Sequence, residues 1–336
     1  MLLSNSPPEQ RAPLLSVAPM MAWTDRHCRY LHRLFAPNAL LFTEMVTTGA
    51  LLHGQQWQLL DFNPAEHPLA LQLGGSEPGA LAQCAQQAAA LGYDEVNLNV
   101  GCPSERVQKG AFGACLMREP ELVAECVAAM CNATHIPITV KCRLGVDNDD
   151  SDELLLNFID SVSQGGCQRF YVHARKAILA GLSPAQNRSI PPLQAHRVEL
   201  LKHLRPDLQI IINGGIDTTA EVQAHLRWAD GVMIGRAAYH NPVWLSTLDQ
   251  QLFGDHPDSS TSPQVLDVLS VYRAYIKTQL ALGEPLHAMT RHLLSVCNGQ
   301  PGARRFRQLL SDNKRLKHND INLLDEALAQ VFERAA

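Results

Sequence analysis

Polar and cationic residues stand directly after short apolar runs, where parallel strands would end. Lys141 follows ITV and His173 follows FYV. An ammonium or imidazole group in such a place could hold an anionic cofactor or stabilise an anionic intermediate. Residues of the same kind close other runs: Gln72, Asn97, Asn99, Arg143, Arg175 and Asn213. A single residue of this kind is often structural, and Lys141 could instead pair with a carboxylate such as Glu44. A full set of them on one rim predicts a functional site.

Two glycine-containing strand ends predict a site for a phosphate group. One run ends in Asn213, Gly214 and Gly215 before Thr218, and the next ends in Gly235 and Arg236. Exposed backbone N–H groups near a helix start, together with a fixed positive charge, favour an anion. Ordinary tight turns are the alternative. We expect a phosphorylated cofactor or substrate here.

The chain has nine cysteines, an odd number without paired CxxC spacing. This pattern predicts neither a disulfide framework nor a metal site. Most of them lie in apolar segments and should be buried. Cys102 differs because it stands between Gly101 and Pro103, directly after a predicted strand. It is the candidate for a reactive thiol.

The elements that must position these residues alternate between strands and helices. Thr24, Ser151 and Thr218 precede helical segments as candidate N-caps. Eight strands in about 230 residues, without a GxGxxG after the first, favour a (β/α)8 TIM barrel over a doubly wound sheet. The predicted strands are residues 14–20, 39–45, 68–73, 95–100, 137–142, 169–174, 209–214 and 231–235.

Composition changes after the barrel. We expect a loose lead-in over residues 1–13, the barrel over 14–250, a linker over 251–263 and a bundle of helices over 264–336. The net charge of −5 hides an asymmetry. Lys and Arg number 18 against 26 Asp and Glu in residues 1–259, but 10 against 7 in residues 260–336. Residues 287–318 carry 7 against 1, so the second domain has a basic patch that could hold nucleic acid or simply be a solvated face.

The chain of 336 residues is 46% hydrophobic and 18% charged, which is typical of an ordered globular protein. No uninterrupted apolar run is long enough for a membrane span, and the N-terminus lacks signal-peptide features. We therefore expect a cytoplasmic protein without a membrane partner, and a monomer.

Several segments together resemble a known family. They are residues 16–33, 43–54, 69–75, 97–117, 140–147, 172–193, 212–216 and 230–242. The GCPS and HARKA blocks, in this order, are the most specific. The chain resembles the tRNA-dihydrouridine synthases, most closely the bacterial A subgroup, from about residue 14 to the final helices.

The resemblance implies an FMN-binding barrel and a helical domain that holds tRNA. Cys102 matches the catalytic residue, and Asn99, Arg188, Arg304 and Arg307 match positions that contact tRNA. Position 185, commonly Lys in similar sequences, is Ala185 here, so one phosphate contact is missing or replaced. The positions that match the FMN site are Ala18, Pro19, Met20, Gln72, Lys141, His173, Asn213, Gly214, Gly215, Gly235 and Arg236.

The implied reaction is reduction of the uracil 5,6-double bond at D-loop positions 20 and 20a. NADPH reduces FMN, reduced FMN gives a hydride to carbon 6, and Cys102 gives a proton to carbon 5. Two alternatives stay open. One is an FMN barrel reductase of a free pyrimidine or enone, which would not need the basic tail. The other is an RNA-binding protein that keeps FMN as a relic.

Overall fold

A computed structural model of the protein describes residues 13–254 and 264–332. Eight parallel strands form one sheet in the order β1-β8-β7-β6-β5-β4-β3-β2. The ring closes because the Leu40 N–H donates to the Leu15 carbonyl at 2.9 Å and the Val17 N–H donates to the Leu40 carbonyl at 3.0 Å. The strands are β1 (Leu14–Val17), β2 (Leu41–Thr47), β3 (Leu69–Gly74), β4 (Glu95–Val100), β5 (Ile138–Arg143), β6 (Arg169–His173), β7 (Gln209–Asn213) and β8 (Gly231–Ile234).

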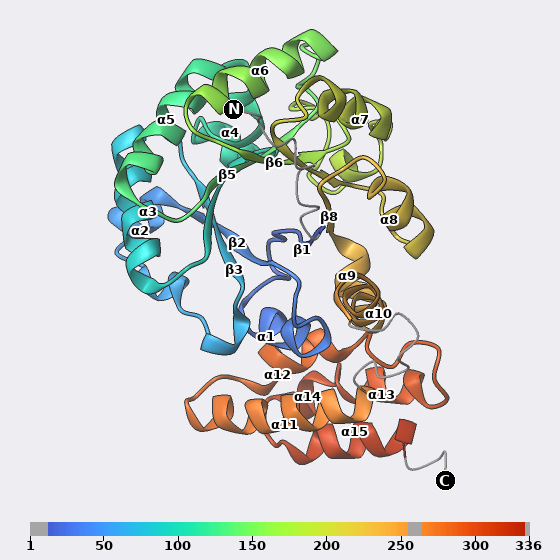
Figure 1. Cartoon of the computed structure of the whole chain (residues 1–336). Helices are drawn as coiled ribbons and strands as arrows, with labels where there is room; N and C mark the ends of the chain where they lie inside the picture. Colours follow the sequence, from blue (N-terminus) through green and yellow to red (C-terminus); the bar gives the residue numbers. More distant parts are fainter. Residues whose placement is uncertain (1–12, 255–263, 333–336) are drawn as a thin grey trace, which may run out of the picture.

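Helices surround this ring, and the predicted TIM barrel is confirmed (Figure 1). The main core lies between strands and helices, because side chains alternate along each strand. In β4, for example, Val96, Leu98 and Val100 belong to that core. The helices of this part are α1 (Arg26–Phe35), α2 (Thr48–Leu52), α3 (Pro78–Leu91), α4 (Glu105–Lys109), α5 (Pro120–Ala133), α6 (Asp152–Gln164), α7 (Ala195–Leu204), α8 (Thr219–His225), α9 (Arg236–His240) and α10 (Pro242–Phe253).

Two of the three candidate N-caps are confirmed. The Ser151 side chain accepts from the Leu154 N–H, and Thr218 forms a capping box with Glu221. Thr24 is not the cap of α1. Asp25 takes this place, because its carboxylate accepts from two N–H groups of the first turn while the Thr24 hydroxyl bonds to the preceding loop.

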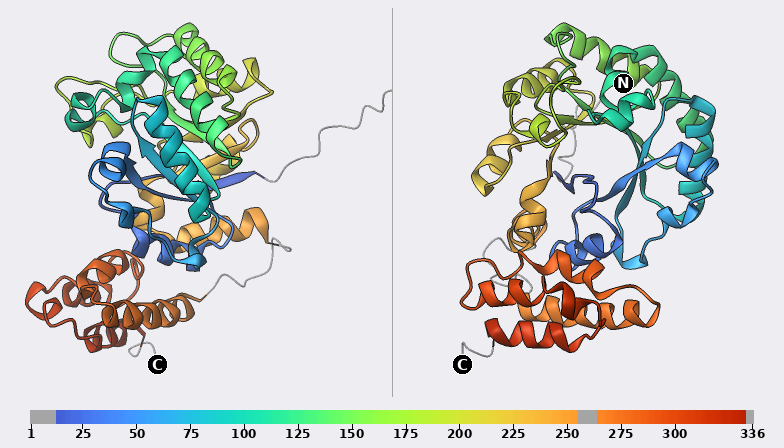
Figure 2. Two further views of the ribbon diagram at one scale, coloured as in Figure 1. Left: turned by 90° about the vertical axis from the view of Figure 1, so that its left-hand side faces the viewer. Right: turned by 180° about the vertical axis from the view of Figure 1, so that it is seen from behind.

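The C-terminal helices form a separate group beside α1 (Figures 1 and 2). They share a second hydrophobic cluster, to which α1 contributes Leu31 and Phe35. The linker is expected over residues 251–263, but its first residues are helical, because α10 continues to Phe253 and packs Leu252 and Phe253 against the barrel core. Residues 255–263 of the expected linker lie outside the described residues. The helices are α11 (Val265–Ala281), α12 (Leu286–Thr290), α13 (Ala303–Leu309), α14 (Asn313–Leu316) and α15 (Asn322–Phe332).

None of the helices in the described ranges is both long and apolar enough to cross a bilayer.

Candidate active site

A cavity of about 800 Å³ opens at the carboxyl ends of the strands. Its volume lies within the range of small-molecule sites, roughly 300–1,000 Å³. The residues that match the cofactor, catalytic and tRNA positions, Arg304 and Arg307 excepted, all line this cavity: Ala18, Pro19, Met20, Gln72, Asn99, Cys102, Lys141, His173, Arg188, Asn213, Gly214, Gly215, Gly235 and Arg236. The exceptions, Arg304 and Arg307, lie on α13, away from the cavity. Of the other residues predicted at strand ends, Arg143 lines the cavity, whereas Asn97, which is buried inside the barrel, and Arg175 do not.

Lys141 stands near the end of β5 and has an amide as its partner. Its Nζ donates to Asn213 Oδ1 at 2.9 Å, and Asn213 Nδ2 donates to the Met233 carbonyl at 2.8 Å. The alternative pairing with Glu44 is therefore not the one found. Burial lowers the pKa of Lys141 to about 8, and the nearby Arg143 adds to this effect. An anionic ligand would favour the charged ammonium.

His173, at the end of β6, is held neutral. Burial lowers the pKa of His173 well below its ordinary value, and the charges of Arg143 and Lys141 act in the same direction. Gly214 approaches the imidazole so closely that a Cβ there would lie 2.5 Å from His173 Cδ2. Gly214 and Gly215 also have positive φ angles of 108° and 66°. Both positions therefore require glycine.

The rim beyond Gly214 carries an excess of positive charge. Arg175, Arg188 and Arg236 have no carboxylate within ion-pair distance among the residues that the structure describes, although each is near another arginine. Arg175 donates from NH1 to the Pro191 carbonyl, but its buried Nε has no partner. Cations that converge without counter-ions favour a bound anion.

The loop that carries Cys102 is held by hydrogen bonds to two side chains, Asn99 and Arg143. The N–H groups of Gly101 and Cys102 donate to Asn99 Oδ1 at 3.1 and 3.0 Å. Behind the loop, Arg143 Nε donates to the Gly101 carbonyl at 2.8 Å. The thiol itself is half-buried and lies 3.5 Å from the Ser104 hydroxyl. The backbone is thus fixed while the thiol stays accessible from the cavity.

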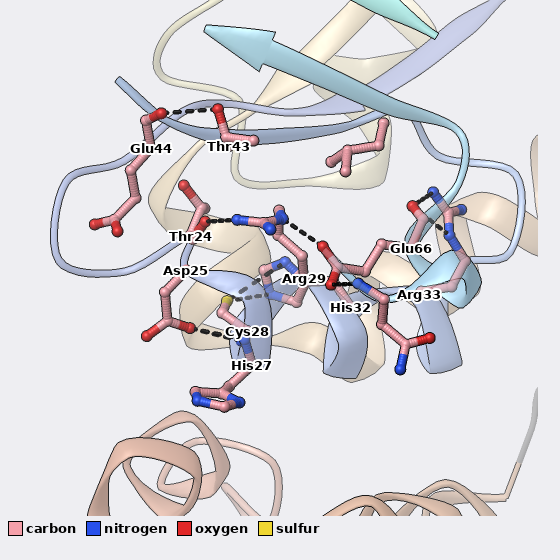
Figure 3. Close-up of polar contacts among 12 residues, drawn as sticks. Thr24, Asp25, His27, Cys28, Arg29, His32, Arg33, Thr43, Glu44 and Glu66 are labelled. Atoms are coloured by element: carbon pink, nitrogen blue, oxygen red, sulfur yellow. Dashed lines mark hydrogen bonds and ion pairs between the residues drawn. The ribbon is translucent and has the colours of Figure 1, made fainter. Parts of the chain in front are cut away.

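The loop after β1, which carries Met20, depends on Arg29 and Glu66, which the sequence did not single out, and on Glu44, which it suggested only as a partner of Lys141. Buried Arg29 donates from NH1 to the Thr24 carbonyl at 3.0 Å and from Nε to Glu66 Oε2 at 2.6 Å (Figure 3). On the cavity side, Glu44 accepts from the Ala22 N–H. The sequence does carry a signal for this contact, because Arg29 lies on the first turns of an amphipathic helix. Its partner could not be identified in the same way, since Glu66 lies 37 residues away along the chain.

Asp25 joins this loop to the C-terminal helices. Its carboxylate caps α1 and also binds Arg291 and His292, with His292 Nε2 at 3.0 Å from Oδ1. Burial alone would raise the pKa of Asp25, but His292, the Cys28 N–H and Arg291 together hold it well below its usual range. The ion pair between Arg26 and Glu284 likewise joins α1 to the C-terminal helices, across the contact between the two parts that we call the seam.

The basic residues of α13 lie on its solvent-exposed face. Arg304 and Arg307 are both exposed, whereas Ala303, Phe306 and Leu309 face the C-terminal hydrophobic cluster. Arg307 donates to Asn298 Oδ1 at 2.7 Å. The side chain of Asn298 in turn donates to the carbonyl of His240 at 3.5 Å, at the end of α9. This contact places Arg307 at the seam with the barrel.

The cavity fits a flavin phosphate. The Gly214–Gly215 turn, where a Cβ would collide with His173 or Leu193, lines the cavity together with Arg188 and Arg236. Lys141 and Asn99 lie deeper in the cavity, next to the loop of Cys102. Unpaired cations, an amide-lined pocket and an accessible thiol at the mouth of one barrel are typical of a barrel enzyme that binds a phosphorylated ligand.

Comparisons with known proteins agree with this class. The family model described as dihydrouridine synthase matches residues 16–333. The protein is 54% identical over 321 residues to the tRNA-dihydrouridine(20/20a) synthase of Xanthomonas axonopodis pv. citri (strain 306), covering 96% of this chain and 95% of that one. It is 53% identical over 320 residues to the enzyme of that name from Escherichia coli (strain K12), covering 95% and 92%.

The chain therefore belongs to the dihydrouridine synthase family, whose members are flavin-dependent oxidoreductases. A solved structure of a 2-naphthoyl-CoA reductase complex shares the fold, with a TM-score of 0.53 at 11% identity over 72% of this chain and 50% of that one.

Proposed function

We propose that the protein reduces uridines of tRNA, at positions 20 and 20a of the D-loop, to dihydrouridine, with FMN as cofactor and NADPH as reductant. The observation that carries this proposal is the identity of 53–54% to tRNA-dihydrouridine(20/20a) synthases over nearly the full length of both chains. It includes the basic C-terminal helices, which a reductase of small molecules would not need. A tRNA substrate also fits a cytoplasmic location.

The residues that would hold the cofactor divide by chemistry. Gly214, Gly215 and Arg236 would bind the phosphate, and Lys141 would face the ring system. A bound flavin supplies the hydride that the uracil double bond receives. His173 stays neutral, because burial and nearby cations lower its pKa, so it can accept or donate a hydrogen bond without adding charge.

Cys102 would act as the general acid of the reaction. A hydride on carbon 6 leaves negative charge at carbon 5 and the adjacent carbonyl oxygen, and the Cys102 thiol lies in the cavity to supply the missing proton. Lys141 would stabilise this charge with its ammonium group. Asn99 would orient the base, since its carboxamide lies in the same wall of the cavity.

The cavity admits a single nucleotide but not a folded RNA, so the target uridine must leave its stack. Arg188, at the mouth, would contact the extruded nucleotide or its phosphate. Arg304 and Arg307 would hold the body of the tRNA from the second domain, because phosphate contacts position an RNA without reading its sequence. We propose the division into a barrel and a tRNA-binding helical domain on the same grounds, with a monomer as the working unit.

The test is a reconstituted reaction with FMN, NADPH and tRNA that lacks dihydrouridine. We expect dihydrouridine at positions 20 and 20a, mapped by mass spectrometry of nuclease fragments, and no turnover of free uridine. Turnover of free uridine or of an enone would favour the small-molecule reductase. A flavin that NADPH bleaches but tRNA does not reoxidise would favour an RNA-binding protein with a relic cofactor.

A further inference from the structure

A continuous row of hydrogen bonds crosses the interior of the barrel between β3, β4 and β5. Asn99 Nδ2 donates to Gln72 Oε1, and Gln72 Nε2 donates to Asn97 Oδ1, both at 2.8 Å. Asn97 Nδ2 then donates to Thr139 Oγ1 at 2.8 Å, and the Thr139 hydroxyl donates to Glu95 Oε1 at 2.6 Å. All five side chains are buried. The row connects the wall of the cavity to the amino end of β4.

Both ends of the row require its hydrogen bonds to donate in the same direction, from the cavity toward Glu95. At the cavity, Asn99 Oδ1 accepts from the N–H groups of Gly101 and Cys102, which can only donate. The oxygen of each carboxamide is thereby assigned, and every later link must donate away from the cavity. Such a row needs a pure acceptor at its far end, and the Glu95 carboxylate supplies it.

The far end is held in the acceptor state by two further donors. Arg169 NH1 lies 2.6 Å and the Tyr171 hydroxyl 3.2 Å from Glu95 Oε2. Burial raises the pKa of Glu95 despite the charge of Arg169, so the acceptor role rests on the three donors that point at the carboxylate, from Thr139, Arg169 and Tyr171. Reversing any carboxamide would place two donors or two acceptors face to face in a dry interior, which is costly.

Filling the barrel does not require this polar row. The other half of the interior is apolar and packs Phe42, Ile211 and Met233 around Ala18 and Ala70. The polar half lies instead under the two carboxamides that line the cavity, and it ends on the backbone of the catalytic loop. Its placement therefore points to the site rather than to the stability of the barrel alone.

We propose that Glu95, Asn97 and Thr139 are positioning residues of the active site, an inference that rests on the proposed function. They hold Gln72 and Asn99 in a single orientation. In that orientation each carboxamide keeps one N–H outside the row. A ligand ring in the cavity therefore meets a hydrogen-bond donor at both places. Through Asn99 the row also fixes the backbone of Cys102.

The test compares Thr139→Val, which removes the hydroxyl with little change of shape, and Thr139→Ser, which keeps it. Ser16→Ala is the matched control, because Ser16 is buried in the barrel and donates to the Val232 carbonyl outside the row. Three quantities are measured: the Kd and absorption spectrum of bound FMN, the alkylation rate of Cys102 in flavin-free protein, and kcat and KM with tRNA.

For Thr139→Val we expect the Kd of FMN to rise about tenfold, as for a buried hydrogen bond left unmade. The alkylation rate of Cys102 should change several-fold, and kcat should fall with little change in the KM for tRNA, which is held elsewhere. Thr139→Ser should return all values to within about twofold of the wild type, and Ser16→Ala should leave them unchanged.

Wild-type values of FMN affinity and Cys102 reactivity in Thr139→Val would overturn the proposal, and so would a Thr139→Ser protein as impaired as Thr139→Val. If Thr139→Val does not fold, Glu95→Met with Arg169→Met removes the terminal acceptor without leaving a buried unpaired charge, because a methionine side chain offers no oxygen to the Thr139 hydroxyl. Unaltered FMN binding and thiol reactivity there would equally contradict the inference. A wild type that forms no dihydrouridine contradicts only the proposed function, because FMN binding and alkylation do not depend on it.

Discussion

At the scale of single residues, Cys102 is separated from the other cysteines by its surroundings. Burial raises the pKa of the remaining thiols, which keeps them protonated and unreactive; these are Cys28, Cys84, Cys115, Cys126, Cys131, Cys142, Cys167 and Cys297. Cys102 faces the cavity from a loop whose backbone is hydrogen-bonded to Asn99. Proton donation to a substrate requires this accessibility, not burial.

We expect Cys102→Ala to keep FMN bound and reducible by NADPH while dihydrouridine formation falls about 10²- to 10⁴-fold, the usual worth of a general acid. Stopped-flow absorbance separates flavin reduction from its reoxidation by tRNA. Cys115→Ala is the control, since that half-buried thiol donates only to the Phe112 carbonyl. Full activity of Cys102→Ala would remove this thiol from the mechanism.

Lys141 should make flavin binding depend on pH. Burial lowers the pKa of Lys141 to about 8, so in the flavin-free protein this side chain is cationic below this pH and neutral above it. An anionic ligand binds the cationic form more tightly, and the affinity for FMN should therefore fall as the pH rises through about 8. Fluorescence titrations between pH 7 and 9 measure the effect. Lys141→Met should bind more weakly and without this slope; an equal slope in both proteins would assign it to another group.

At the scale of elements, the strand ends were predictable and the contacts between elements were not. Lys141, His173 and Asn213 could be assigned to one rim because parallel strands of a barrel end at the same face. Glu95 and Thr139 could not be paired, because their hydrogen bond joins residues 44 apart and depends on the register of β4 against β5. Asp25 shows the same limit, since its partners Arg291 and His292 come from the other end of the chain.

The turn after β7 should not tolerate a side chain. In Gly214→Ala, the new Cβ would lie 2.5 Å from His173 Cδ2, and the backbone would keep a φ that favours glycine. We expect the Kd of FMN to rise at least about tenfold, measured by flavin release, with secondary structure retained. Gly49→Ala serves as the control because a Cβ there has no neighbour within 4 Å. Normal flavin content in Gly214→Ala would show that the turn does not form the phosphate cradle.

At the scale of the whole molecule, charge is divided between the two parts. Residues 1–259 carry a net charge of −8 and residues 260–336 a net charge of +3. The rim around Arg188 and Arg236 is thus a positively charged region on a barrel whose net charge is negative. The arginines of α13 add positive charge on the other side of the seam. A polyanion that contacts both regions would be oriented across the mouth.

Arg304→Glu with Arg307→Glu should weaken tRNA binding about tenfold or more and leave flavin reduction by NADPH unchanged. The slope of log Kd against log salt should fall by about one for each phosphate group that the variant no longer neutralises. Filter binding at several salt concentrations measures both. Lys277→Glu, a charge reversal on the exposed side of α11, should bind tRNA normally. Unchanged affinity and slope in the double variant would make α13 an ordinary solvated face.

The position of α1 has a consequence for biosynthesis. Leu31 and Phe35 belong to the hydrophobic cluster of the C-terminal helices, and Tyr272 donates its hydroxyl to the His27 carbonyl. On the ribosome, α1 emerges more than 200 residues before α11, so its apolar face waits for a partner through the synthesis of the entire barrel. A nascent chain arrested after residue 254 should consequently engage chaperones at α1, and release should follow the emergence of residues 265–332.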